Sequence, residues 1–111
     1  MQKDPILKVI IGTCALAVAV MLCSSAKADE KNAALYKQKC AACHGADGKG
    51  ETATGKAMKV RSFADPEVVK MSDEDLSSAI EKGKGKMPAY GKSLKPDEIK
   101  AMVAYIRSLA K

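Results

Sequence analysis

The sequence predicts an all-α fold of three to five short helices in a single domain. Two observations carry this prediction. There is no long alternating run of β-branched residues, so nothing favours a sheet. Short segments with helix-start residues and helical apolar spacing instead alternate with glycine-containing loops. The sequence shows no internal repeat, no low-complexity tract and no boundary of a second domain.

Residues 1–28 have the parts of a secretory signal peptide. Two lysines precede a mostly apolar stretch, Val9–Cys23, and Ala26-Lys27-Ala28 is a small-residue cleavage motif. We therefore expect cleavage before Asp29 and export of residues 29–111 to the periplasm. The alternative is an uncleaved membrane anchor, but an apolar run of about 15 residues is shorter than the ~20 that a spanning helix needs.

The first helix is expected at Glu30–Lys39, with Ala33, Leu35 and Tyr36 as its apolar positions. It leads directly into Cys40-Ala41-Ala42-Cys43-His44. This C-x-x-C-H pattern is typical of covalent haem attachment. Two thiols three positions apart can add to the two vinyl groups of one porphyrin edge, and the next residue can act as the proximal iron ligand.

Two other interpretations of this motif are weaker. A thioredoxin-like redox pair would not need His44, and a closed zinc site on Cys40, Cys43 and His44 would need a fourth ligand. Residues 29–111 contain no other cysteine or histidine. One covalently bound haem c would use both thiols, and its porphyrin would complete a protein core that is marginal for 83 residues without Trp and with one Phe.

The segment after the motif is expected to be a loop, residues 45–50, with Asp47-Gly48 as its turn. Residues 51–62 show no clear preference. Asp65-Pro66 starts a short helix, because Asp is a good N-cap and Pro a good first residue. The apolar residues of that helix are Val68, Val69 and Met71.

Two further helices are expected. Ser72 opens one with a capping-box-like pattern, and Gly83 ends it. Its apolar face holds Leu76, Ala79 and Ile80. Pro96 opens the last helix, followed by two acids at the positive end of its dipole. The apolar stripe of this helix consists of Ile99, Met102, Val103, Ile106 and Ala110.

A methionine is the expected sixth ligand of the iron, because His44 is the only histidine. Four methionines remain after residue 28: Met58, Met71, Met87 and Met102. Met71 and Met102 are expected to be packing residues, whereas Met58 stays possible. Met87 is the best candidate. Glycines before it permit close approach of the backbone to the porphyrin ring, and Pro88 restricts the Met87 backbone to extended conformations.

Three segments together resemble a small class I cytochrome c of the bacterial monohaem type. They are Cys40–Gly45, Gly85–Tyr90 and the helix that ends near Ala104-Tyr105-Ile106. The resemblance covers residues 29–111 and implies the class I cytochrome c fold, with helices wrapped around one haem. It also implies that the first and last helices cross at Tyr36 and Tyr105.

The resemblance also implies the ligand set. Cys40 and Cys43 would carry the covalent haem thioethers, His44 would be the proximal axial ligand and Met87 the distal one. One departure concerns a proline that the family often has soon after the motif, whose carbonyl holds the axial imidazole N–H. No proline occurs between His44 and Pro66.

His/Met ligation saturates the iron and leaves no open position for a substrate. We therefore expect a soluble one-electron carrier between redox partners, with no catalytic residues. The alternative is a small haem enzyme or a gas or redox sensor with a labile sixth ligand, peroxidase-like in character. That alternative would need a distal acid–base group, typically a second histidine, which the chain lacks.

The charge suggests the kind of partner. The net charge of +6 becomes +4 without residues 1–28, which carry three lysines and one aspartate. Eight lysines flank the two ligand loops in sequence: Lys39, Lys49, Lys56, Lys59, Lys82, Lys84, Lys86 and Lys92. They favour redox proteins with acidic docking surfaces. The alternative is an ordinary solvated lysine surface.

Without an aromatic platform for bases, no nucleic acid is expected as a partner. We expect a monomer with no stable membrane insertion after cleavage.

Overall fold

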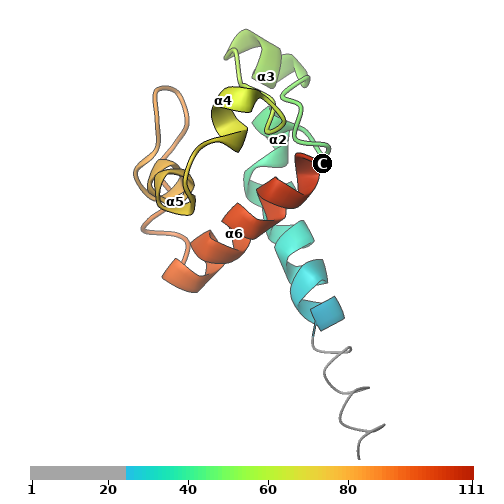
Figure 1. The fold of residues 1–111 in the computed structure, drawn as a ribbon, viewed down its shortest axis with the longest axis vertical. Helices are drawn as coiled ribbons and strands as arrows, with labels where there is room; N and C mark the ends of the chain where they lie inside the picture. The colour runs from blue at the N-terminus through green and yellow to red at the C-terminus, as the bar shows by residue number, and fades with distance from the viewer. Residues whose placement is uncertain (1–24) are drawn as a thin grey trace, which may run out of the picture. The chain divides into compact units, whose positions relative to one another are not determined.

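A computed structural model of the protein describes residues 25–111. Residues 25–39 are helical. They are followed by α2 (Ala41–His44), α3 (Ala53–Ala57), α4 (Pro66–Val69), α5 (Asp73–Lys82) and α6 (Pro96–Leu109) (Figure 1). The described residues form no strand, only an isolated bridge between Lys84 and Met87. The predicted all-α class is confirmed.

The compact unit that carries the C-x-x-C-H motif spans residues 32–111. The predicted signal peptide, residues 1–28, lies outside the described residues except for 25–28, which are helical. Within residues 25–111, no helix is both long enough and apolar enough to cross a membrane.

All four helices expected from the sequence are present, and the ends of α4 and α5 follow the expected capping. Asp65 caps α4 by accepting a hydrogen bond from the backbone N–H of Glu67, and Pro66 is the first helical residue. Ser72 caps α5 by accepting from the N–H of Asp75, and Gly83 ends this helix at a φ of 75°. Such a positive φ favours glycine because other residues meet a steric penalty there.

Helical structure exceeds the sequence prediction in three places. The first helix includes residues 25–29, which lie before the expected start at Glu30 and contain alanine and lysine of high helix propensity. α2 carries the motif itself, and α3 lies in the unassigned segment 51–62. α2 and α3 are each about one turn long, too short for an apolar period to reveal them.

The core forms mainly along α6. Ile99, Met102, Val103 and Ile106 of the predicted stripe are buried, while Ala110 is only partly buried and lies at the C-cap. The other buried hydrophobic residues are Tyr36, Phe63, Leu76, Ile80 and Leu94. Segments from along the described compact unit thus contribute to one cluster around α6, and Ala41 of α2 packs against it. α2 and α3 lie beside each other.

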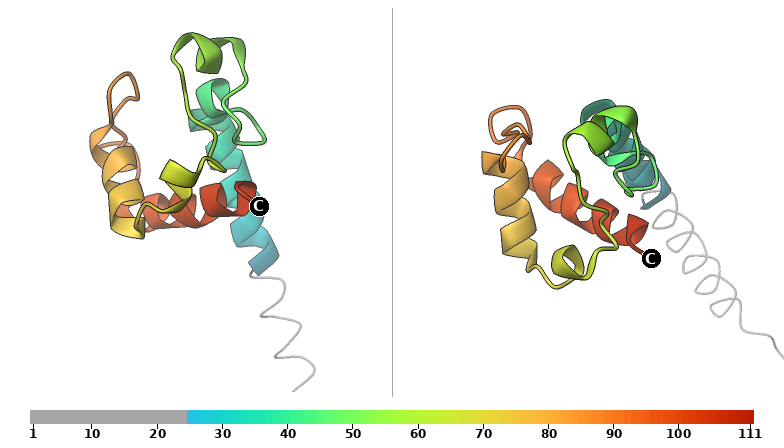
Figure 2. Two further views of the ribbon diagram at one scale, coloured as in Figure 1. Left: turned by 45° about the horizontal axis from the view of Figure 1, so that its top comes forward. Right: turned by 90° about the horizontal axis from the view of Figure 1, so that it is seen from above.

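α6 crosses the helical residues 32–39 (Figures 1 and 2). At this crossing the ring centroids of Tyr36 and Tyr105 lie 5.0 Å apart, as the resemblance implied. α5 also packs against α6. In the left view of Figure 2, α5 with its following loop and α2 with α3 rise on the same side of α6. The motif and the loop that contains Met87 therefore stand over one face of α6.

Candidate functional site

The two cysteines of the motif lie on one helical turn. Cys40 is the N-cap residue of α2 and Cys43 lies in the helix, with the N–H of His44 donating to the carbonyl of Cys40 at 3.0 Å. Residues three positions apart lie on the same side of a helix, so both thiols can reach one edge of a planar group. Both are half-buried free thiols. Burial is the main cause that raises the pKa of the Cys40 thiol, and the neighbouring Cys43 is the second cause.

The His44 imidazole stacks on the ring of Phe63, with ring centroids 4.8 Å apart and an interplanar angle of 22°. Burial lowers the pKa of His44, which favours the neutral imidazole that coordinates metals. Its Nδ1 is fully buried and has no hydrogen-bond partner among the described residues. Nε2 also makes no hydrogen bond with them but is not fully buried, so it is the nitrogen that can reach a ligand.

Three hydrogen bonds fix the backbone of the motif. The Tyr36 hydroxyl donates to the carbonyl of Gly45 at 2.6 Å, and the Gly50 N–H donates to the carbonyl of His44 at 2.7 Å. The Thr52 hydroxyl donates to the carbonyl of Ala42 at 2.8 Å. The last carbonyls of a helix have no partner within it, and these bonds supply partners for α2.

Close backbone packing explains two of the glycines. A Cβ on Gly55 would collide with the carbonyl oxygen of Cys43, so α3 can rest on the motif only with glycine there. A Cβ on Gly48 would lie 2.5 Å from the Phe63 ring, and Gly48 also has a φ of 74°. Sequence reasoning missed the roles of Thr52, Gly55 and Phe63, because these contacts join segments whose proximity no local pattern reveals.

The loop before Met87 is a tight turn. The Met87 N–H donates to the carbonyl of Lys84 at 3.0 Å, and the Lys84 N–H donates back to the carbonyl of Met87 at 3.3 Å. Gly85 occupies this turn with a φ of 58°. A Cβ on Gly83 would lie 2.6 Å from the Met87 carbonyl oxygen, so the glycines permit this close path. Met87 itself is half-buried against the core.

Tyr90 links this loop to the motif. Its hydroxyl donates to the carbonyl of Lys39 at 2.9 Å, across 51 positions of sequence. Lys39 directly precedes Cys40, and Tyr90 lies three residues after Met87. The structure therefore brings the Met87 loop beside the segment that carries both cysteines. Nothing in the local sequence indicated this role of Tyr90.

The other three methionines lie in different environments. Met102 is 1% exposed in the core, as expected for a packing residue. Met71 is half-buried and packs against the same core. Met58, which the sequence left possible as a ligand, is 44% exposed at the C-cap of α3.

The described residues contain no group of three or more His, Cys, Asp or Glu side chains that could hold a metal ion. The zinc alternative therefore finds no ligand set in this part of the chain. A haem fits the same residues, because it needs two thiols on one turn, one accessible imidazole nitrogen and a soft donor on a nearby loop.

An all-α fold with C-x-x-C-H on a one-turn helix and a methionine loop tied to it defines a class I c-type cytochrome. The chain belongs to the family described as "Cytochrome C oxidase, cbb3-type, subunit III", whose sequence profile matches residues 27–106. Membership of this c-type cytochrome family implies covalently bound haem c.

Individual relatives agree with this class. The chain is 33% identical over 84 residues to the Cbb3-type cytochrome c oxidase subunit FixP of Azorhizobium caulinodans, and 32% identical over 88 residues to the subunit CcoP of Azospirillum brasilense. These matches cover 74% and 78% of this chain but only 27% and 30% of the relatives.

Two other relatives are matched over a larger share of their own length than FixP and CcoP. A cytochrome c6 of Gloeothece citriformis is 35% identical over 73 residues, which are 65% of this chain and 63% of that one. The solved structure of the KustC0563 c-type cytochrome superimposes with a TM-score of 0.66 at 38% identity, covering 72% of this chain and 98% of that one.

Proposed function

We propose that this cytochrome is a one-electron carrier whose single haem c is bound through Cys40 and Cys43, with His44 and Met87 as axial ligands. The observation that carries the proposal is the hydrogen bond from Tyr90 to the carbonyl of Lys39. It keeps a thioether donor and an imidazole in the same part of the fold. When bound, the haem supplies a reversible one-electron change at its iron.

The chain's own residues suit such a carrier. Burial lowers the pKa of His44, which favours the neutral imidazole, and its Nε2 is accessible. Met87 offers a neutral, soft donor that raises the potential relative to bis-histidine ligation. Two axial ligands from the protein leave no position for a substrate, so the described residues favour electron exchange over activation of a small molecule. The α2 and Met87 segments are both anchored by backbone hydrogen bonds, and the Tyr90 hydroxyl bonds the Met87 loop to the carbonyl of Lys39, which limits their rearrangement between oxidation states.

Met87→Ala tests the ligand assignment directly. The ferric protein should show the weak near-infrared band of sulfur-to-iron charge transfer, and Met87→Ala should abolish it and give high-spin or water-ligated haem. Its potential should fall, because the thioether favours ferrous iron. Met58→Ala is the matched control, because Met58 is the most exposed of the four methionines after residue 28 and should leave the band unchanged.

Two results would contradict the proposal in different ways. A band that survives in Met87→Ala and disappears in Met58→Ala would mean that the carrier has a different ligand. A native protein that never shows the band would have no methionine ligand, and the haem enzyme or sensor would then become the better interpretation.

The proposed partners are redox proteins with acidic docking surfaces. All eight lysines that flank the ligand loops are exposed, and none forms an ion pair with the described residues. Lys82, Lys84 and Lys86 belong to the end of α5 and the loop after it, whereas three acids lie in the first turn of α5. Such a separation of charge can orient a partner before contact.

Relatives also support electron exchange with a protein partner. FixP and CcoP are named as subunits of a cytochrome c oxidase. A monomer that meets its partners transiently is the form that we propose here. The signal peptide predicted at residues 1–28 supports export and a periplasmic location for residues 29–111.

A further inference from the structure

The His44 imidazole stacks on an aromatic ring, and its buried Nδ1 has no hydrogen-bond partner among the described residues. Its ring is stacked on Phe63 at a centroid distance of 4.8 Å. Its inward nitrogen, Nδ1, is fully buried and unpartnered. A buried imidazole is normally oriented by a hydrogen bond from the nitrogen that does not bind the metal. Here the stacking contact is the interaction that can set the plane of the ring.

Phe63 is itself firmly placed. It is 9% exposed, and its backbone N–H donates to the carbonyl of Gly48 at 2.9 Å. Gly48 has no side chain, which leaves room for the Phe63 ring against its backbone. On another side, the edge of the ring meets Tyr36, with centroids 6.4 Å apart and planes at 65°. A ring fixed by these contacts can act as a rigid platform for a second ring.

We propose that Phe63 is the positioning residue for the axial imidazole, and that its ring replaces the missing hydrogen bond at Nδ1. This inference rests on the proposed ligation by His44. If Nε2 binds the iron, Nδ1 is the nitrogen that stays buried without a hydrogen-bond partner among the described residues. Packing against Phe63 would then fix the rotation of the His44 imidazole about its bond to the iron.

The test compares substitutions in the haem-loaded protein. Phe63→Leu keeps apolar volume but removes the flat surface, and Phe63→Tyr keeps that surface. Val68→Ala, a residue that packs against the same core from α4, serves as the control for lost packing. The readouts are the g-values of the ferric protein by electron paramagnetic resonance and the spread of the haem methyl proton shifts, which both depend on the orientation of the imidazole plane.

Phe63→Leu should shift or broaden both signals, while the near-infrared band stays. Phe63→Tyr should show both signals as in the native protein. Val68→Ala should lower the Tm without moving either signal. The inference is overturned if Phe63→Leu has the g-values and methyl spread of the native protein, or if Val68→Ala moves them equally. If the native protein is low-spin and Phe63→Leu leaves the g-values and methyl shifts unchanged, the inference fails but the ligand assignment stands. A native protein without low-spin haem would refute the ligand assignment itself.

The native protein provides a second measurement if Phe63→Leu does not yield a haem-loaded fold. In the ferrous state, the proton on Nδ1 of ¹⁵N-labelled His44 should resonate upfield, as expected for an N–H without an acceptor. A downfield, hydrogen-bonded position for this proton would overturn the inference.

Discussion

Tyr36 shows how one hydroxyl can hold the haem motif. The side chain is 2% exposed, and its hydroxyl donates to the carbonyl of Gly45, directly after His44. Burial is the main cause that raises the pKa of Tyr36, so the phenol keeps its proton and remains a donor at physiological pH. The bond joins the first helix to the end of α2.

Tyr36→Phe should lower the free energy of unfolding of the haem-loaded protein by about 1–3 kcal/mol, because a buried carbonyl loses its donor. Denaturant unfolding measures this change. Tyr105→Phe is the matched control: its ring packs on Tyr36, but its hydroxyl makes no hydrogen bond with the described residues. Equal losses from the two substitutions would show that the Gly45 bond contributes nothing specific.

Cys40 and Cys43 lead to a prediction about covalent attachment. Thioether bonds survive acid–acetone extraction and coordination bonds do not, so the haem should stay with the protein. The mass of the exported protein should equal residues 29–111 plus one haem, which also tests cleavage before Asp29. An apoprotein mass with haem in the solvent would contradict the assignment, and a mass that includes residues 1–28 would contradict the cleavage alone.

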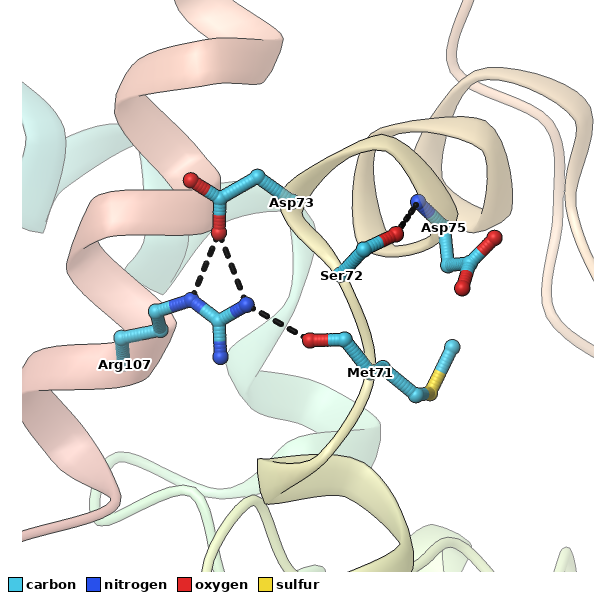
Figure 3. Close-up of polar contacts among 5 residues, drawn as sticks. All are labelled: Met71, Ser72, Asp73, Asp75 and Arg107. Carbon is cyan, nitrogen blue, oxygen red and sulfur yellow. Dashed lines mark hydrogen bonds and ion pairs between the residues drawn. The ribbon is translucent and has the colours of Figure 1, made fainter.

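At the scale of elements, one arginine ties α5 to α6 (Figure 3). Arg107 near the end of α6 donates from Nε to a carboxylate oxygen of Asp73 at 2.8 Å, and from its terminal nitrogen to the carbonyl of Met71 at 2.8 Å. Asp73 is the first residue of α5, directly after the Ser72 cap. The arginine therefore fixes the start of α5, whose other end leads into the Met87 loop.

Asp73→Ala should cost more stability than Glu74→Ala. Both substitutions remove an acid from the first turn of α5, but only Asp73 pairs with Arg107. Because the Asp73 side chain is 71% exposed, the pair itself should contribute only about 0.2–1 kcal/mol, and the difference should shrink at high salt. Thermal unfolding of the two variants at low and high salt measures it. Equal stability of the two variants at low salt would mean that the Asp73–Arg107 pair contributes nothing to stability.

At the scale of the whole molecule, the lysines predict how the protein meets its partners. If the lysines around the two ligand loops form a docking surface, electron transfer to an acidic partner should slow as salt rises. The Debye length is ~10 Å at 0.1 M, so steering fades near physiological ionic strength. Stopped-flow kinetics over a salt series would measure this dependence.

Lys86→Glu and Lys111→Glu separate a local surface from total charge. Both residues are exposed and both changes alter the net charge equally, but only Lys86 adjoins Met87. Lys86→Glu should slow association more than Lys111→Glu. Equal effects would support the alternative of an ordinary solvated lysine surface.

Much of the fold follows from local chemistry and was predictable. Helix ends depend on single residues, so Asp65, Ser72 and Gly83 marked the limits of α4 and α5 correctly. The buried side of α6 follows from apolar spacing along one helix. The C-x-x-C-H motif indicated a c-type haem because its chemistry resides in five consecutive residues.

The rest depends on contacts between distant segments. The stacking of Phe63 on His44, the bond from Tyr90 to Lys39 and the fit of Gly55 against Cys43 join residues 12 to 51 positions apart. No local pattern encodes these distances, because they are set by how α6 and the loops pack. The sequence alone thus determined four of the helices, the haem motif and the class of protein. Only the tertiary structure decided what surrounds the imidazole and where the Met87 loop lies, since those depend on side chains meeting across the fold.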